Sequence, residues 1–95
     1  MSGPYTAFRV QGGTLSLTAT DVVQLLRSLH ELKDPAADSI AEEIEVLQLA
    51  GVRVDLRPTD AETGALISAI SKIIASSPGA RPSFGRLLGL VRGPA

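Results

Sequence analysis

The chain contains no cysteine and no tryptophan, and only three of its 95 residues are aromatic. Without cysteine, the sequence excludes a disulfide framework, a thiol nucleophile and a thiolate-bound zinc ion. No apolar run approaches the roughly 18–20 residues that span a bilayer, and the first ten residues, MSGPYTAFRV, lack the basic and then apolar character of a signal peptide. We therefore expect a cytoplasmic protein without stable membrane insertion, whose core consists mainly of aliphatic side chains.

The net charge is also small, at −1, but the charges are unevenly distributed along the chain. Residues 1–62 contain five basic and ten acidic residues, whereas residues 63–95 contain four basic residues and no acidic one. The sequence therefore predicts an acidic body followed by a basic C-terminal part. With 44% hydrophobic residues and the length of one domain, the chain as a whole is not expected to be disordered.

Hydrophobic periodicity predicts an α+β fold with elements in the order ββααβα. Apolar and polar residues alternate on both sides of Gly12-Gly13, which is typical of a β-hairpin. Apolar residues then recur at helical spacing in two segments that meet at Asp34-Pro35, followed by an expected third strand over residues 52–56 and a long helix over residues 59–76. We expect three helices on one face of a small three-stranded sheet, with the third strand parallel to the second.

Local capping signals mark the ends of these helices. Thr18 with Asp21 and Thr59 with Glu62 have the spacing of a capping box, in which the two side chains satisfy backbone N–H groups at the start of a helix. Gly51 follows the second predicted helix and is expected to cap its C-terminus.

The domain is expected to cover residues 1–78, and residues 79–95 are expected to form a basic, apolar tail that contains glycine and proline. Phe84, Leu87, Leu88 and Val91 have the spacing of anchors on one face of an amphipathic helix, and Arg81, Arg86 and Arg92 accompany them. Gly85 and Gly89 each weaken a helix by about 1 kcal/mol relative to alanine. The tail is therefore expected to become ordered on contact, either with its own domain or with a protein partner.

The predicted helix over residues 59–76 carries a stripe of small side chains, Ala61, Ala65 and Ala69. From Thr63 to Ala80 the only charged residue is Lys72, although a surface helix normally has a charged outer face. Either the helix is covered on two sides within the monomer, or the alanine face packs against a second subunit. We hypothesise a homodimer that uses this stripe or an edge of the sheet.

No residue pattern predicts a catalytic, cofactor-binding or metal-binding site. His30 is the only histidine, and with Asp34 and either Ser28 or Ser16 it would supply the parts of a hydrolytic triad. No serine lies in a G-x-S-x-G turn, however, and Ser28 is two residues from His30 on a predicted helix, so their side chains face different ways. We therefore expect a non-enzymatic protein.

Two further patterns also lack the context that their chemistry requires. The acidic residues Asp38, Glu42, Glu43 and Glu45 lie on one predicted helix without a calcium-binding loop, which favours a solvated face over a metal site. Gly12-Gly13 is not part of a phosphate-binding motif and precedes a strand instead of a helix.

The spacing I-x-x-E-I-x-x-L-x-x-x-G-V-x-V, from Ile40 to Val54, resembles the last helix and wing strand of winged-helix DNA-binding domains. This resemblance covers about a third of the chain and implies a nucleic-acid-associated regulator. The helix that would contact DNA, however, carries the four carboxylates named above, which would repel phosphates. We thus expect a small, homodimeric protein-interaction or regulatory module in which the tail docks on a partner or on its own domain, with the winged-helix regulator as the alternative.

Overall fold

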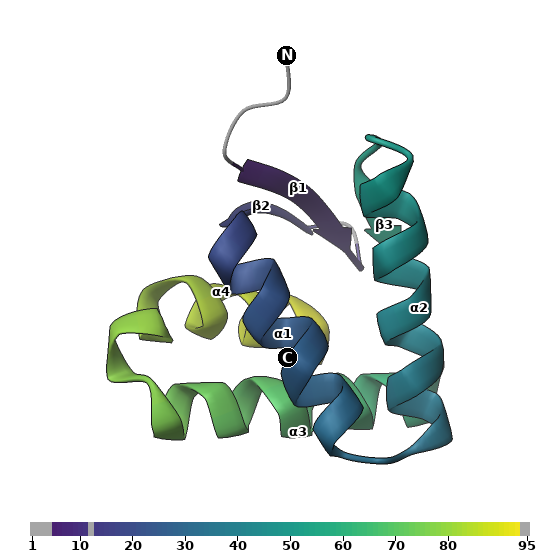
Figure 1. Cartoon of the computed structure of the whole chain (residues 1–95). Coiled ribbons are helices and arrows are strands. Elements are labelled where there is room, and N and C mark those ends of the chain that lie inside the picture. Colours follow the sequence, from purple (N-terminus) through teal and green to yellow (C-terminus); the bar gives the residue numbers. More distant parts are fainter. Residues whose placement is uncertain (1–4, 12, 94–95) are drawn as a thin grey trace.

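Four helices accompany a three-stranded sheet in the computed structural model, which describes residues 5–11 and 13–93 (Figure 1). In chain order the elements are β1 (Tyr5–Val10), β2 (Gly13–Thr18), α1 (Ala19–Glu31), α2 (Pro35–Leu49), β3 (Val54–Leu56), α3 (Asp60–Ser76), a 3-10 turn η1 (Pro78–Ala80) and α4 (Arg81–Arg92). The α+β class and the three strands are confirmed. The expected order ββααβα was wrong at its end, because a fourth helix gives ββααβαα.

The sheet has the strand order β2-β1-β3, so β1 is central and β2 is an edge strand. β1 and β2 form the expected antiparallel hairpin, in which Phe8 lies opposite Leu15. Along β1, Phe8 and Val10 are buried while Ala7 and Arg9 are exposed. One face of the sheet therefore contributes to the core, and the other face is open to solvent.

The expectation that the third strand pairs with the second was wrong, because β3 pairs in parallel with β1, with Val54 opposite Phe8. The reason is the connection between β2 and β3. α1 leads away from the end of β2 and α2 returns beside it, so the chain re-enters the sheet at the end from which it left (Figure 1). A strand that begins there runs opposite to β2 and hence parallel to β1.

The predicted capping signals are confirmed. The Thr18 and Thr59 side chains accept hydrogen bonds from the N–H groups of Asp21 and Glu62, and the two acidic side chains complete both capping boxes. Gly51 has a positive φ of 73°, and the N–H of the following Val52 donates to the Leu47 carbonyl, as in a Schellman motif. β3 begins only after this motif, at Val54, so Val52 lies outside the strand and is half exposed.

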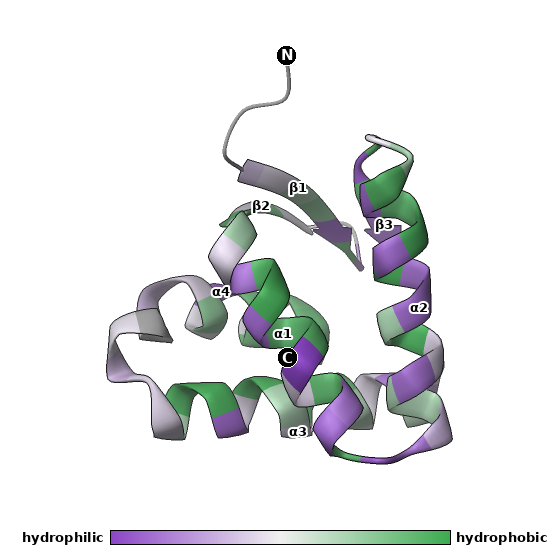
Figure 2. Ribbon diagram, in the orientation of Figure 1, coloured by the Kyte–Doolittle hydropathy of each residue, from purple (hydrophilic) through white to green (hydrophobic). Residues whose placement is uncertain are grey.

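α4 forms because its apolar side chains complete the core. Phe84, Leu87 and Val91 are almost fully buried, and the helix contacts α3 and β2. Burying a side chain of this size contributes about 1.5–3 kcal/mol, which outweighs the helix-weakening effect of Gly85 and Gly89 at about 1 kcal/mol each. In Figure 2 the segment from the end of α3 into α4 is pale, whereas α2 alternates strongly between hydrophilic and hydrophobic residues. Burial therefore makes α4 a helix despite the two glycines in it.

Candidate functional site

A groove separates the edge strand β2 from α4. It has a volume of about 540 Å³ and is lined on the strand side by Thr14, Leu15 and Ser16, and on the helix side by Pro82, Ser83, Arg86, Gly89 and Leu90. The two walls come from the first twenty and the last fifteen residues of the chain. The groove thus exists only because α4 lies next to the hairpin.

Two contacts near the hairpin turn position α4 beside β2. Gly13 lies so close to the Leu90 side chain that a Cβ atom at residue 13 would collide with it. Gln11 donates a hydrogen bond from its Nε2 to the Val91 carbonyl at 2.7 Å, which satisfies one of the carbonyl groups at the end of α4. Gln11 itself has a positive φ of 50°. The hairpin therefore anchors the C-terminal end of the helix that forms the opposite wall.

The strand wall of the groove exposes backbone hydrogen-bonding groups. Val10 and Gly13 are paired and are separated by only two residues, which makes them a hydrogen-bonded pair of a tight hairpin. Because such pairs alternate along an antiparallel ladder, Thr14 and Ser16 direct their N–H and C=O groups away from β1. These groups face the open edge at the positions that line the groove.

The two edges of the sheet differ in how well they are protected against pairing with another strand. β3 is three residues long and is followed closely by Arg57 and Pro58, and charges, prolines and shortness all discourage edge pairing. β2 is six residues long, with the sequence GTLSLT, and contains neither a charge nor a proline. Of the two edge strands, β2 is therefore the one less protected against pairing, and it borders the groove.

Among the residues whose side chains the structure describes, Arg86 is the only charged one that lines the groove. Its side chain is exposed, and it forms no ion pair with any other residue in the described part of the chain. Leu15 and Leu90 supply apolar surface beside it and are partly buried. The groove therefore combines unpaired backbone groups, an apolar surface and one positive charge.

The structure divides the tail residues proposed from the sequence into two groups. Phe84, Leu87 and Val91 lie in the domain's own core, and Leu88 is packed against it. Arg86 and Arg92 are exposed, whereas the side chain of Arg81 lies outside the described part of the structure. The apolar anchors are thus occupied within the monomer, and among the proposed partner-binding tail residues with described side chains only Arg86 lines the groove.

The alanine stripe proposed for dimerisation lies largely inside the monomer. Ala65 and Ala69 are buried, at 5% and 0% exposure, and only Ala61 is exposed. α3 is in contact with the other three α-helices, and the Ser28 hydroxyl of α1 donates a hydrogen bond to the Ala69 carbonyl at 3.0 Å. The small side chains therefore serve close helix packing within one chain, and Ala65 and Ala69 present no surface to a second subunit.

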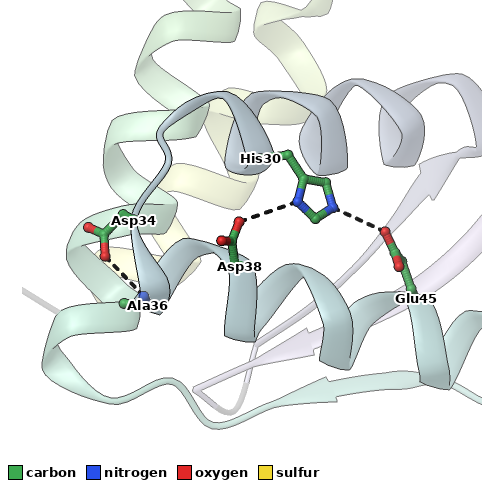
Figure 3. A network of polar contacts seen from close by, with 5 residues as sticks. All are labelled: His30, Asp34, Ala36, Asp38 and Glu45. Carbon is green, nitrogen blue, oxygen red and sulfur yellow. Dashed lines mark hydrogen bonds and ion pairs between the residues drawn. The ribbon is translucent and has the colours of Figure 1, made fainter.

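His30 connects α1 to α2 through two carboxylates (Figure 3). Its Nδ1 lies 3.4 Å from Asp38 Oδ1 and its Nε2 lies 3.3 Å from Glu45 Oε1. The hydrogen bond to Glu45, and secondarily the contact with Asp38, raise the pKa of His30 above its ordinary value. Asp34 is not a partner of His30, because its carboxylate accepts a hydrogen bond from the Ala36 N–H at the start of α2. With Ser28 bound to α3, the hypothetical triad is not assembled.

The other carboxylates of α2, Glu42 and Glu43, belong to exposed residues. Partial burial raises the pKa of the Glu43 carboxyl, and repulsion from Glu62 at the start of α3 adds to the shift. No group of three or more histidine or acidic side chains that could hold a metal ion occurs among the described residues. No helix in the same part of the chain is both long and apolar enough to cross a membrane.

The strand residues of the groove, Thr14, Leu15 and Ser16, were not among the site residues proposed from the sequence. The absence of charge and proline in GTLSLT is a usable signal, but it becomes informative only once the strand order shows that β2 is an edge. Comparisons of the chain with protein-family models, with curated proteins and with solved structures each give no match.

Proposed function

We propose that this protein is a non-enzymatic protein-interaction module and that the groove between β2 and α4 is its docking surface. The observation that supports the proposal is the groove itself, in which an unprotected strand edge faces a helix across about 540 Å³. Concave sites with apolar walls and a few polar groups usually bind small molecules, and an exposed strand edge is where an extended peptide can add to a sheet.

The proposal assigns α4 a different role from the one expected of a free docking tail. Releasing α4 would expose Phe84, Leu87 and Val91, all of which lie in the core. At about 1.5–3 kcal/mol for each buried side chain, release would remove a large fraction of a typical domain's stability. α4 therefore acts as a fixed wall of the binding site, and the partner supplies the mobile segment.

The test is a peptide selection against the full chain, followed by one blocking substitution. Gly89 lines the groove and a Cβ atom there would meet nothing within 4 Å, so Gly89→Trp fills the groove without a clash at its own position. Gly64 in α3 has the same open surroundings and does not line the groove, which makes Gly64→Trp the matched control.

Peptides selected on the wild-type protein from a random displayed library should bind Gly64→Trp with unchanged affinity and bind Gly89→Trp at least about tenfold more weakly, as expected when a central contact is lost. Equal binding to both variants would place the interaction elsewhere, and failure to select any peptide would contradict the proposal.

The winged-helix alternative is less well supported. The helix that would approach DNA exposes Asp38, Glu42 and Glu43, and these charges oppose binding to a phosphate backbone. Binding of duplex DNA at low salt that weakens steeply as salt is added would favour this alternative over the peptide-binding proposal.

A further inference from the structure

We infer that the groove binds an extended peptide segment that adds to β2 as a fourth strand and presents a carboxylate to Arg86. This inference rests on the proposed function and specifies the partner's backbone conformation and charge. It follows from three features of the groove: the direction of the backbone groups on β2, the small and apolar surfaces on its two sides, and the cation Arg86, which has no ion-pair partner among the described residues.

The backbone of β2 requires a partner in extended conformation. Thr14 and Ser16 direct N–H and C=O groups to the open edge, and residues two apart on one strand are spaced to bond alternate residues of a neighbouring strand. A helical peptide satisfies its own backbone groups and leaves those of β2 unpaired. Strand addition at an exposed edge satisfies both sets of groups.

α4 leaves room for such a strand and supplies contacts to its side chains. Gly89 has no side chain to obstruct the groove, and nothing lies within 4 Å of the position of its missing Cβ. Leu90 and Leu15 provide apolar surface from the helix and the strand, and Ser83 provides a hydroxyl near the N-terminal end of α4. The side chains of an added strand alternate in direction, so every second one faces this helix.

The charge of the groove selects a partner that carries a carboxylate. Of the side chains that the structure describes, Arg86 is the only charged one lining it, and the chain has no acidic residue after Glu62 to neutralise the α4 wall. A guanidinium group binds a carboxylate through two parallel hydrogen bonds, which adds direction as well as attraction. An aspartate or glutamate side chain and a C-terminal carboxylate offer the same chemistry here, and the experiment below distinguishes them.

A second copy of this chain fits the groove less well. Two copies that paired through β2 would each contribute the strand GTLSLT, which contains no carboxylate for Arg86. The α4 walls would also approach each other with Arg86 and Arg92 exposed, and like charges repel. Charge complementarity therefore favours an acidic peptide over edge-to-edge dimerisation of this protein.

The experiment uses the tightest-binding peptide from the selection, synthesised with single changes and measured against the full-length protein. N-methylation of one residue at a time removes one backbone N–H at a time. A second series replaces each carboxylate of the peptide with its amide, namely Asp→Asn, Glu→Gln or amidation of the C-terminus. On the protein, Arg86→Gln removes the proposed cation, and Arg53→Gln is the control because Arg53 is exposed and does not line the groove.

Strand addition predicts an alternating result, in which N-methylation at every second residue weakens binding about tenfold or more and the residues between tolerate it. Arg86→Gln should weaken binding of the acidic peptide about three- to tenfold, a moderate effect because the side chain is exposed to solvent. The same substitution should not change the affinity for the peptide in which the carboxylate bound by Arg86 has been replaced by an amide. Arg53→Gln should change neither affinity. The amide series shows whether the carboxylate belongs to a side chain or to the C-terminus.

Several outcomes would overturn the inference. If Gly89→Trp blocks the peptide but N-methylation has no alternating effect, the groove is the docking site and strand addition is wrong. If Arg86→Gln weakens acidic and neutral peptides equally, the carboxylate requirement is wrong. A wild-type protein that sediments as a dimer and becomes monomeric on Ser16→Pro would assign the edge to a second copy. Absence of any groove-binding peptide would reject the inference together with the proposed function.

Discussion

α2 and α4 form helices for different reasons. α2 begins with Asp34 as N-cap and Pro35 in its first turn, ends before Gly51, and contains no glycine. α4 contains two glycines and a proline within twelve residues. Both helices contribute to the core: α4 buries Phe84, Leu87 and Val91, and α2 buries Ala37, Ile40, Ala41 and Ile44 while it leaves Leu49 exposed at 89%. Local sequence therefore supports α2 in addition to burial, whereas α4 depends on burial against the rest of the domain.

The two helices also differ in charge. The outer face of α2 carries Asp38, Glu42, Glu43 and Glu45, and α4 carries only arginines among its charged residues. The division between an acidic body and a basic C-terminal part, seen in the sequence, therefore becomes a division between two surfaces of one domain. It also leaves the groove wall formed by α4 positive. The following predictions test how far each helix depends on its local sequence or on its tertiary contacts.

Deletion of residues 79–95 should unfold the domain. It removes Phe84, Leu87 and Val91 from the core, and three side chains at about 1.5–3 kcal/mol each approach the 5–15 kcal/mol total stability of a typical domain. Far-ultraviolet circular dichroism and the dispersion of NMR amide signals measure the outcome. A truncated chain that keeps its fold would show that the core does not need the buried side chains of α4.

Phe84→Ala should lower the free energy of unfolding by about 3–5 kcal/mol, because it leaves a cavity in the core. Leu49→Ala is the comparison on α2, and it should change the stability by less than about 0.5 kcal/mol, because Leu49 is 89% exposed. Urea unfolding of both variants measures the difference. Similar losses from the two substitutions would contradict the difference in burial between Phe84 and Leu49.

Gly85→Ala and Gly51→Ala should have opposite effects. Gly85 is exposed in α4 with nothing near its missing Cβ, so alanine should stabilise the protein by up to about 1 kcal/mol through helix propensity. Gly51 has a φ of 73° at the end of α2, so alanine there should destabilise by about 1 kcal/mol. Urea unfolding gives both signs. A destabilising Gly85→Ala would mean that α4 does not have the helical backbone described.

Protonation of His30 should have the smallest effect, because His30, Asp38 and Glu45 are each about half exposed. The contacts raise the pKa of His30 above 6.5 in the folded state. Their contribution to stability is therefore complete below the unfolded-state pKa and disappears as the pH rises through the folded-state value. The stability advantage of wild type over His30→Gln should be larger at about pH 5.5 than at about pH 8.

An NMR titration of the His30 ring measures the shifted pKa directly. A pKa at or below 6.5 would show that Asp38 and Glu45 do not stabilise the protonated His30 ring.

Much of the fold was predictable because its signals are local. The alternation around Gly12-Gly13, the Thr18 and Thr59 capping boxes and the Gly51 cap each depend on residues within a few positions of one another. The partner of β3 was not predictable in the same way. It depends on two helices returning the chain to the end of the sheet from which it left, and no local pattern encodes that geometry.

The candidate site shows the same limit. Arg86 was identified from the charge and spacing of the C-terminal segment, but Thr14, Leu15 and Ser16 became part of a site only through the position of α4. Ala65 and Ala69 were proposed as interface residues from the sequence, but the structure buries them inside the monomer. A stripe of small residues is compatible with contacts inside the chain or between chains, and only the tertiary structure shows that these two lie within the monomer.

The sequence by itself determined the α+β class, the helix starts and the separation of acidic and basic charge, because periodicity, capping and composition act over short distances or are simple sums. The tertiary structure decided that the C-terminal segment is a helix, that β2 is an edge and that the two enclose a groove. The helix and the groove depend on burial of Phe84, Leu87 and Val91 against residues more than ten positions away in the chain. The edge position of β2 depends on the pairing of β3 with β1. Both burial and strand pairing between distant segments are properties of the folded domain as a whole.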